Sequence, residues 1–150
     1  MNEFMKICVE EANNGVLNND GGPFGACIID SNNNVIASSH NTVLKDNDPT
    51  AHAEVNAIRK ACNKLKTYNL EGYTLFTNCE PCPMCLSAII WSNIKTVYYG
   101  CTRKDAEKIG FRDNAIYDFI NNKNKDLIKL ENIDRENCIK DFLNYDKTLY

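Results

Sequence analysis

The sequence predicts a single α/β domain over residues 1–150, in the form of a three-layer α/β/α sandwich built on a mixed sheet. Three observations lead to this fold class. A β-hairpin pattern near the N-terminus is followed by alternating helical and strand patterns, which place helices on both faces of a sheet. The chain has 150 residues, of which 43% are hydrophobic, and this is enough for one core. No internal repeat and no linker rich in Pro, Gly and Ser divides it.

The first half of the chain predicts a hairpin between two helices. Apolar residues at helical spacing predict an amphipathic N-terminal helix that closes near Gly15; they are Phe4, Ile7, Cys8 and Ala12. After a glycine-rich loop at 20–23, residues 24–30 and 35–39 form the hairpin around a turn of three asparagines. Asp48-Pro49-Thr50 is typical of a helix start, with Asp48 or Thr50 as the cap. The apolar face of this second helix carries Ala57, Ile58, Ala61, Cys62 and Leu65.

The second half predicts alternating strands and helices. Residues 73–77 and 95–101 are expected to be strands. Between them, a short helix opens at Pro81 and runs to about Trp91; it is apolar nearly all round, so we expect it to be buried. A helical stretch from Thr102, a loop near Gly110 and helices near 115–120 and 135–144 complete the chain.

Composition argues against nucleic acid and membrane partners. The formal net charge is −3, whereas a phosphate backbone favours a basic face. The longest apolar run, around Leu86 to Trp91, is too short to span a bilayer, and the start of the chain lacks the pattern of a secretory signal. We therefore expect a soluble, cytoplasmic protein.

Cysteine usage points to a metal site rather than to disulfides. Of eight cysteines, Cys82 and Cys85 have metal-ligand spacing. The remaining six have mostly apolar neighbours and are expected to be reduced, buried thiols; they are Cys8, Cys27, Cys62, Cys79, Cys101 and Cys138.

Two segments carry the chemistry: residues 50–54, which contain His52 and Glu54, and residues 81–85, which contain the Cys-x-x-Cys pair. On a helix, Cys82 and Cys85 project from one face. Two thiolates and one imidazole bind Zn²⁺ and leave the fourth tetrahedral position open, which is the arrangement of a catalytic zinc. The other histidine, His40, lies next to the hairpin and is a poor candidate for a fourth ligand.

Glu54 lies on the helix face that must turn inward, because it is in phase with Ala57, Ile58, Ala61 and Leu65. Burial should raise the pKa of its carboxyl, and a carboxylate beside a zinc-activated water can accept a proton and pass it on. Each segment alone is weak evidence for a catalytic zinc site. Cys-x-x-Cys also occurs in redox and structural-metal pairs, and His52 could be a core histidine. Together they match the H-x-E and P-C-x-x-C pattern of zinc deaminases.

Three segments resemble the cytidine and deoxycytidylate deaminase superfamily, and within it they look most like the bacterial guanine deaminases. They are residues 22–26 (GPFGA), 47–54 (NDPTAHAE) and 79–85 (CEPCPMC). The resemblance runs from about residue 4 to the C-terminus. Its extension to guanine rests on residues 105–107 and 110–117 and on the terminal Tyr150.

The resemblance implies that His52, Cys82 and Cys85 bind zinc and that Glu54 shuttles the proton. It further implies a base pocket lined by Phe24 and Asn41, in which Asp113 accepts from a ring N–H of guanine. Similar proteins form homodimers in which the C-terminal segment, here about residues 125–150, is exchanged between subunits, with Tyr150 helping to close the pocket.

Each pocket residue also has a simpler interpretation. Phe24 could be a core aromatic, Asn41 could cap a turn and Asp113 could cap the following helix. Trp91 could stack on a planar base, but its helix favours core packing or an interface. A terminal residue such as Tyr150 is usually frayed. Arg112 departs from the acidic or small residue expected before Asp113 and could pair with it.

The expected reaction is hydrolytic deamination of guanine to xanthine and ammonia. The alternatives are other deaminases, acting on adenosine in tRNA, cytosine, cytidine, guanosine or an aminotriazine. The charge of the C-terminal helix argues against a tRNA substrate, because residues 134–150 carry three basic and four acidic side chains. A zinc-binding scaffold without chemistry would be expected to lack Glu54, and a thiol oxidoreductase would require a thioredoxin-like βαβ context before the cysteines.

Overall fold

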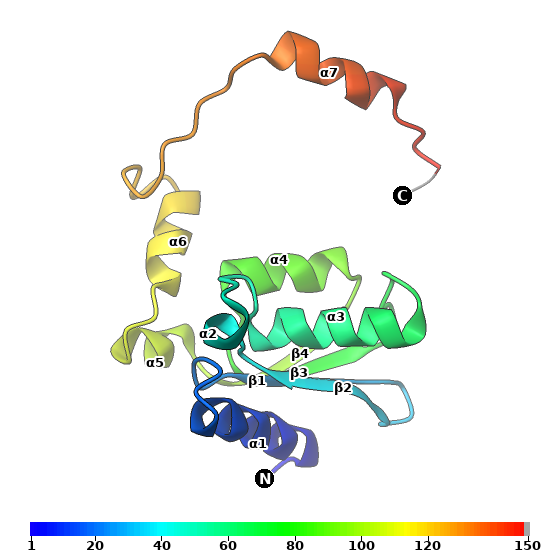
Figure 1. Cartoon of the computed structure of the whole chain (residues 1–150), viewed down its shortest axis with the longest axis vertical. Coiled ribbons are helices and arrows are strands. Elements are labelled where there is room, and N and C mark those ends of the chain that lie inside the picture. The colour runs from blue at the N-terminus through cyan, green and yellow to red at the C-terminus, as the bar shows by residue number, and fades with distance from the viewer. Residues whose placement is uncertain (149–150) are drawn as a thin grey trace.

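The computed structural model describes residues 1–148, and its centre is a mixed four-stranded sheet (Figure 1). The strands are β1 (Gly25–Ile29), β2 (Val35–His40), β3 (Thr74–Cys79) and β4 (Thr96–Cys101), in the order β2-β1-β3-β4. β1 pairs antiparallel with both β2 and β3, whereas β3 and β4 are parallel. The parallel pair requires a crossover, and α4 (Pro83–Trp91) supplies it.

Helices cover both faces of the sheet, as predicted. α1 (Glu3–Leu17) lies on one face, and α3 (Ala53–Leu65) and α4 lie on the other (Figure 1). All five residues of β1 are buried, because its alternate side chains serve two cores. Ala26 and Ile28 pack toward Ala57 of α3. Cys27 and Ile29 pack with Phe4 of α1. The three-layer sandwich with a mixed sheet is therefore confirmed.

The second long helix begins later than the sequence predicts. α3 starts at Ala53 with His52 as its N-cap, not at residues 48–50. The Asp48 side chain accepts from the backbone and hydroxyl of Thr50 instead of capping a helix. Such a local turn competes with helix initiation. A short helix not predicted from sequence, α2 (Val43–Asp46), precedes this turn.

The prediction that α4 is buried is wrong. Its inner face carries Cys85 and Ile89, but Ile90 and Trp91 are 64% and 71% exposed. Near it, the outer edge of the sheet exposes Tyr98 and Tyr99 of β4. A helix that is apolar all round was assigned to the core, whereas here one side of it is solvent-exposed.

The C-terminal part leaves the sandwich. α5 (Arg103–Lys108) and α6 (Asp113–Ile120) follow β4, and a long connection then leads to α7 (Arg135–Asn144), which stands well apart from the sheet (Figure 1). This segment exposes many apolar side chains, among them Leu130, Ile133, Phe142 and Leu143. Within residues 1–148, no helix combines the length and the apolar character needed to cross a membrane.

The eight cysteines are all free, and burial was predicted correctly for part of them. Cys8, Cys27 and Cys79 are buried, and Cys62 is partly buried. Cys101 and Cys138 are exposed, contrary to expectation, because they lie on the uncovered edge strand and on the outlying α7.

Candidate active site

Two helix N-termini bring the three predicted metal ligands together. His52 is the N-cap of α3 and Cys82 is the N-cap of α4, while Cys85 lies in the first turn of α4. α3 and α4 pack side by side over the sheet (Figure 1). Neither N-cap side chain bonds its own helix, so both are available to a ligand. The positive ends of the two helices favour thiolate here.

The donor atoms fit a zinc ion. The Nδ1 atom of His52 lies 3.5 Å from the Sγ of Cys82 and 3.5 Å from the Sγ of Cys85. All three donor atoms lie within 4.8 Å of one another. Zn–S bonds of about 2.3 Å and Zn–N bonds of about 2.05 Å at a tetrahedral angle place sulfur and nitrogen about 3.5 Å apart. The spacing and the donor set therefore match a three-ligand zinc site with one open position.

The three ligands differ in protonation. A hydrogen bond from Cys85, acting against burial, and a further one from His52 lower the pKa of the Cys82 thiol to about 4. The same contacts with Cys82 raise the pKa of His52 and of Cys85, and burial adds to the rise at Cys85. Cys82 is thus favoured as a thiolate, the form that binds zinc, whereas zinc must displace a proton from Cys85.

Glu54 points into the same site from the first turn of α3. It is 5% exposed, and its Oε1 accepts from the Thr77 hydroxyl of β3 at 3.2 Å. The Cys85 thiol lies 3.4 Å from Oε2. Burial raises the pKa of this carboxyl, and the charge of Cys82 adds to the effect. The inward orientation and the raised pKa predicted from the helical pattern are both confirmed.

A small cavity of about 30 Å³ opens beside these residues, about the room of one water molecule. The residues that line it are His52, Glu54, Cys82, Phe24, Glu80, Phe111 and Asp113. An enclosed acid beside a metal site and a water-sized space is the arrangement required to deprotonate a water molecule.

Comparison with known proteins agrees with this geometry. Residues 1–101 match the family model described as the cytidine and deoxycytidylate deaminase zinc-binding region. This chain belongs to that family. A guanine deaminase from Bacillus subtilis is 51% identical over 114 residues, which cover 76% of this chain and 72% of that protein. A tRNA-specific adenosine deaminase from Buchnera aphidicola is 38% identical over 145 residues, covering 96% and 92%.

The likeness extends to the whole architecture. The X-ray structure of guanine deaminase from Bacillus subtilis superposes with a TM-score of 0.89 at 42% identity, covering 98% of this chain and 97% of that one. The outlying C-terminal segment falls within this coverage. With the ligand set and Glu54 in place, the chain is a zinc-dependent hydrolytic deaminase.

In this deaminase, Asp113 shares the cavity with His52 and Cys82. It is the first residue of α6 and lines the cavity, whereas the N-cap is Arg112, so the capping interpretation of Asp113 is wrong. Burial raises the pKa of its carboxyl, with Cys82 and Glu80 adding to the effect, and His52 and Arg103 oppose it. Within residues 1–148, no ion pair joins Arg112 to Asp113.

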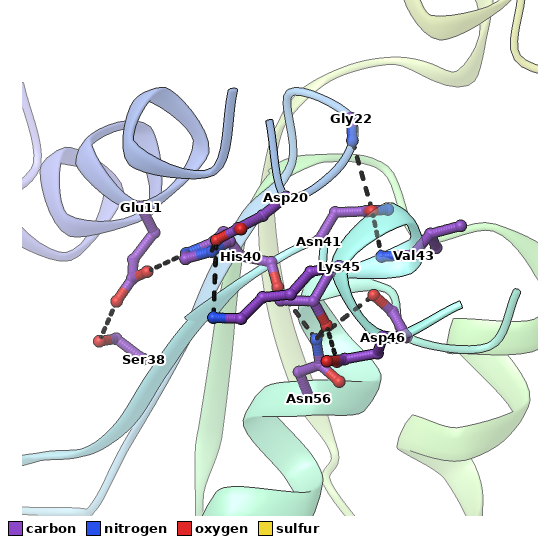
Figure 2. A network of polar contacts seen from close by, with 12 residues as sticks. Glu11, Asp20, Gly22, Ser38, His40, Asn41, Val43, Lys45, Asp46 and Asn56 are labelled. Carbon is purple, nitrogen blue, oxygen red and sulfur yellow. Dashed lines mark hydrogen bonds and ion pairs between the residues drawn. The ribbon is translucent and has the colours of Figure 1, made fainter. Parts of the chain in front are cut away.

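Asn41 is buried and is not one of the residues that line the cavity. Its Oδ1 accepts from the backbone N–H groups of Gly22 at 3.3 Å and Val43 at 3.1 Å (Figure 2). The backbone N–H of Asn41 donates to the carbonyl of Phe24. Because Oδ1 is occupied, the amide can offer a substrate only its Nδ2 donor.

Two predicted pocket residues are not brought to the cavity by the described part of the chain. Trp91 ends α4, at the opposite end of the helix from Cys82, and is mostly exposed. Core packing of Trp91 is therefore wrong, whereas the interface that the sequence equally allows stays a prediction. Base stacking within its own subunit is not supported. Tyr150 lies outside the described residues.

Two cavity residues, Glu80 and Phe111, were not predicted from the sequence. Glu80 stands directly before the Pro-Cys segment, and its Oε2 accepts from the Arg103 backbone at 2.9 Å. The Phe111 ring meets Phe24 edge to face with centroids 4.7 Å apart. Glu80 could have been found from the sequence, because its carboxylate stands two residues before the metal ligand Cys82. Phe111 could not, because only the fold brings it to Phe24. Both rings line the cavity beside the metal ligands.

Proposed function

We propose that this enzyme deaminates guanine to xanthine and ammonia. The observation that carries the proposal is the pairing of the zinc site and Glu54 with the carboxylate of Asp113 across one cavity. The similarity to guanine deaminase from Bacillus subtilis over 98% of the chain supports the choice of base.

Glu54 and Asp113 have separate tasks in the proposed reaction. Zinc, when held by His52, Cys82 and Cys85, supplies a water of lowered pKa as nucleophile. Glu54 accepts the proton of that water and delivers it to the ring nitrogen next to the attacked carbon. Asp113 accepts from a ring N–H and fixes the base. Collapse of the tetrahedral adduct releases ammonia and leaves xanthine, so that one water is consumed for each base.

Ammonia release tests the choice of substrate. We expect turnover of guanine and much slower reaction of guanosine, adenine, cytosine and cytidine in a steady-state assay. A tRNA anticodon stem–loop is included because of the similarity to a tRNA-specific adenosine deaminase. Preference for the stem–loop, or for a pyrimidine, would reject guanine while leaving the deaminase chemistry intact.

Replacing Asp113 with Asn should raise the KM for guanine by about 10- to 100-fold, because hydrogen bonds to charged groups contribute about 1.5–3 kcal/mol. The matched control is Asp118→Asn, an exposed position on the same helix. Initial rates over a range of guanine concentrations separate KM from kcat. An unchanged KM would remove Asp113 from the base-binding role.

We further propose a homodimer in which residues 125–150 are exchanged between subunits. Three features support it: the outlying α7, the exposed apolar residues of the C-terminal segment, and the exposed apolar side chains Leu86, Ile90 and Trp91 on α4. Exposed apolar side chains that gather on one helix are typical of an interaction surface.

Replacing Trp91 with Ser should weaken the dimer at least about tenfold, since burial of one large apolar side chain contributes about 1.5–3 kcal/mol. Sedimentation velocity over a range of protein concentrations measures the change. Leu17→Ser is the control, because Leu17 is equally exposed at the end of α1 but lies on the other side of the sheet. Equal weakening by both substitutions, or by neither, would contradict this interface.

A further inference from the structure

His40 is held between two carboxylates although it is not a metal ligand. It ends β2, and its Nδ1 lies 2.8 Å from the Oε2 of Glu11 on α1 (Figure 2). Its Nε2 lies 2.8 Å from the Oδ2 of Asp20 in the glycine-rich loop. The three side chains are only 12–21% exposed. The ring therefore joins a helix, a strand and a loop at one point.

Each ring nitrogen of His40 faces one carboxylate oxygen. A neutral imidazole has one N–H and one lone pair, so it can donate to only one of two carboxylates. With both carboxylates ionised, the two contacts of 2.8 Å therefore need the imidazolium form. Burial opposes ionisation of Glu11, but the hydrogen bonds from Ser38 and His40 outweigh it and lower its pKa.

The charges around the ring are few. The acidic neighbours are Glu11 on α1 and Asp20 in the loop. Lys45 of α2 approaches Asp20 at 3.9 Å but is 61% exposed, and Lys60 of α3 acts on Glu11 from a distance. An exposed lysine contributes little to such a pair. Within residues 1–148, His40 is thus the side chain that contacts both partly buried carboxylates.

The same loop fixes Asn41. The Asp20 carbonyl accepts from the backbone of Leu44 and Lys45, which anchors the loop to α2. One residue further on, Gly21 passes so close to Asn41 that a Cβ would lie 2.1 Å from Oδ1. Gly22 donates to that Oδ1, and the Asn41 amide is thereby turned with Nδ2 away from the loop (Figure 2). No protein group within residues 1–148 accepts from Nδ2.

The backbone carbonyl of His40 is bound by a side chain of α3. The Nδ2 of Asn56 on α3 donates to this carbonyl at 3.0 Å and to the hydroxyl of Thr42 at 2.8 Å. Asn56 lies one helical turn beyond His52. The stretch from His40 to Thr42 thus links the glycine-rich loop to the start of the helix that carries the metal ligand.

We propose that His40, as an imidazolium bridging Glu11 and Asp20, is a positioning residue that sets the glycine-rich loop and presents the Nδ2 of Asn41 to an acceptor on the purine ring. This role rests on the proposed function. Bridging by the ring aligns Asp20 and Gly22, and Gly22 orients the Asn41 amide. Neither His40 nor its carboxylate partners touch the reacting atoms.

Kinetics of the zinc-loaded enzyme test the role. His40→Gln can contact only one carboxylate, so the loop loses its fixed position and the KM for guanine rises about tenfold, the effect of one neutral hydrogen bond. kcat and zinc content stay within about twofold of wild type, because interactions made equally in ground and transition states affect KM alone. Lys45→Met, which removes an exposed cation beside the same Asp20, leaves both constants unchanged.

A second variant separates positioning from general support of the fold. In Asp20→Asn the new amide can donate to the lone pair of a neutral His40 ring, so both contacts persist without the second proton. We expect KM within about twofold of wild type. A large rise in KM for Asp20→Asn, or parallel losses of kcat and zinc in His40→Gln, would overturn the proposal.

Nitrogen-15 NMR gives a readout that does not depend on the substrate. The chain has two histidines, and His40→Gln assigns the signals of His40. We expect both ring nitrogens of His40 to carry a proton in the zinc-loaded enzyme without ligand. A single protonated nitrogen contradicts the bridge. If instead both nitrogens are protonated but wild-type enzyme does not deaminate guanine, the proposed substrate fails and the bridge stands.

Discussion

Glu54→Gln is expected to retain zinc and to lower kcat by about 10³-fold, the size of a general acid–base contribution. The substitution keeps the shape of the side chain and its contact with the Thr77 hydroxyl, but the amide cannot accept a proton from water. The zinc ligands His52, Cys82 and Cys85 are untouched. Ammonia release under saturating guanine gives kcat, and metal analysis of the same sample gives the zinc content.

Stability provides an independent check on the same variant. Burial raises the pKa of Glu54, so its charged form is disfavoured in the folded protein. A neutral Gln lacks this cost, and the melting temperature should not fall. Glu71→Gln is the matched control, because Glu71 is exposed. Retention of wild-type kcat by zinc-loaded Glu54→Gln would remove Glu54 as the proton carrier.

The part of the site that sequence predicts best is the part fixed by helical geometry. Cys82 and Cys85 share a helix face because they are three residues apart, and Glu54 is in phase with the apolar face of α3. Both statements depend only on the repeat of one helix. The packing of α3 against α4 then joins the two local patterns into one site.

Other features depend on interactions that the pattern does not contain. The start of α3 was misplaced because Asp48 bonds Thr50 locally, an alternative to capping that the sequence alone does not decide. The exposure of Trp91 could not be foreseen, because an apolar helix looks the same whether its outer side meets a core or a second subunit. The edge-to-face contact of Phe24 with Phe111 joins residues far apart in the chain.

The orientation of the Asn41 amide also could not be predicted in full from the sequence. The bond from the Val43 backbone to Oδ1 is the local turn cap that the sequence offered, but the bond from Gly22 follows from the path of the glycine-rich loop. His40 was correctly excluded as a zinc ligand. The reason, its capture between Glu11 and Asp20, required the packing of α1 against the sheet.

Cys85→Ser is expected to lower the affinity for zinc by more than about 10²-fold, since loss of a group that merely supports a ligand already costs about 10- to 100-fold. Cys85 is fully buried, so no solvent-exposed side chain can take its place. Serine is close in size but is a much weaker ligand for zinc than a thiolate. Zinc titration against a chelating dye measures the affinity, and guanine turnover should fall with occupancy.

The α/β/α sandwich should still fold when Cys85→Ser weakens zinc binding. The two cores on either side of β1 contain neither Cys82 nor His52, so folding of the sheet does not depend on the ion. We expect the far-ultraviolet circular dichroism spectrum to be unchanged. The melting temperature should fall, because zinc bound to the folded state no longer stabilises it. Cys138→Ser, at an exposed position on α7, is the control and should keep full zinc binding. Full zinc affinity in Cys85→Ser would show that the ion is held by a different set of ligands, and the assignment of Glu54 beside its open position would fall with it.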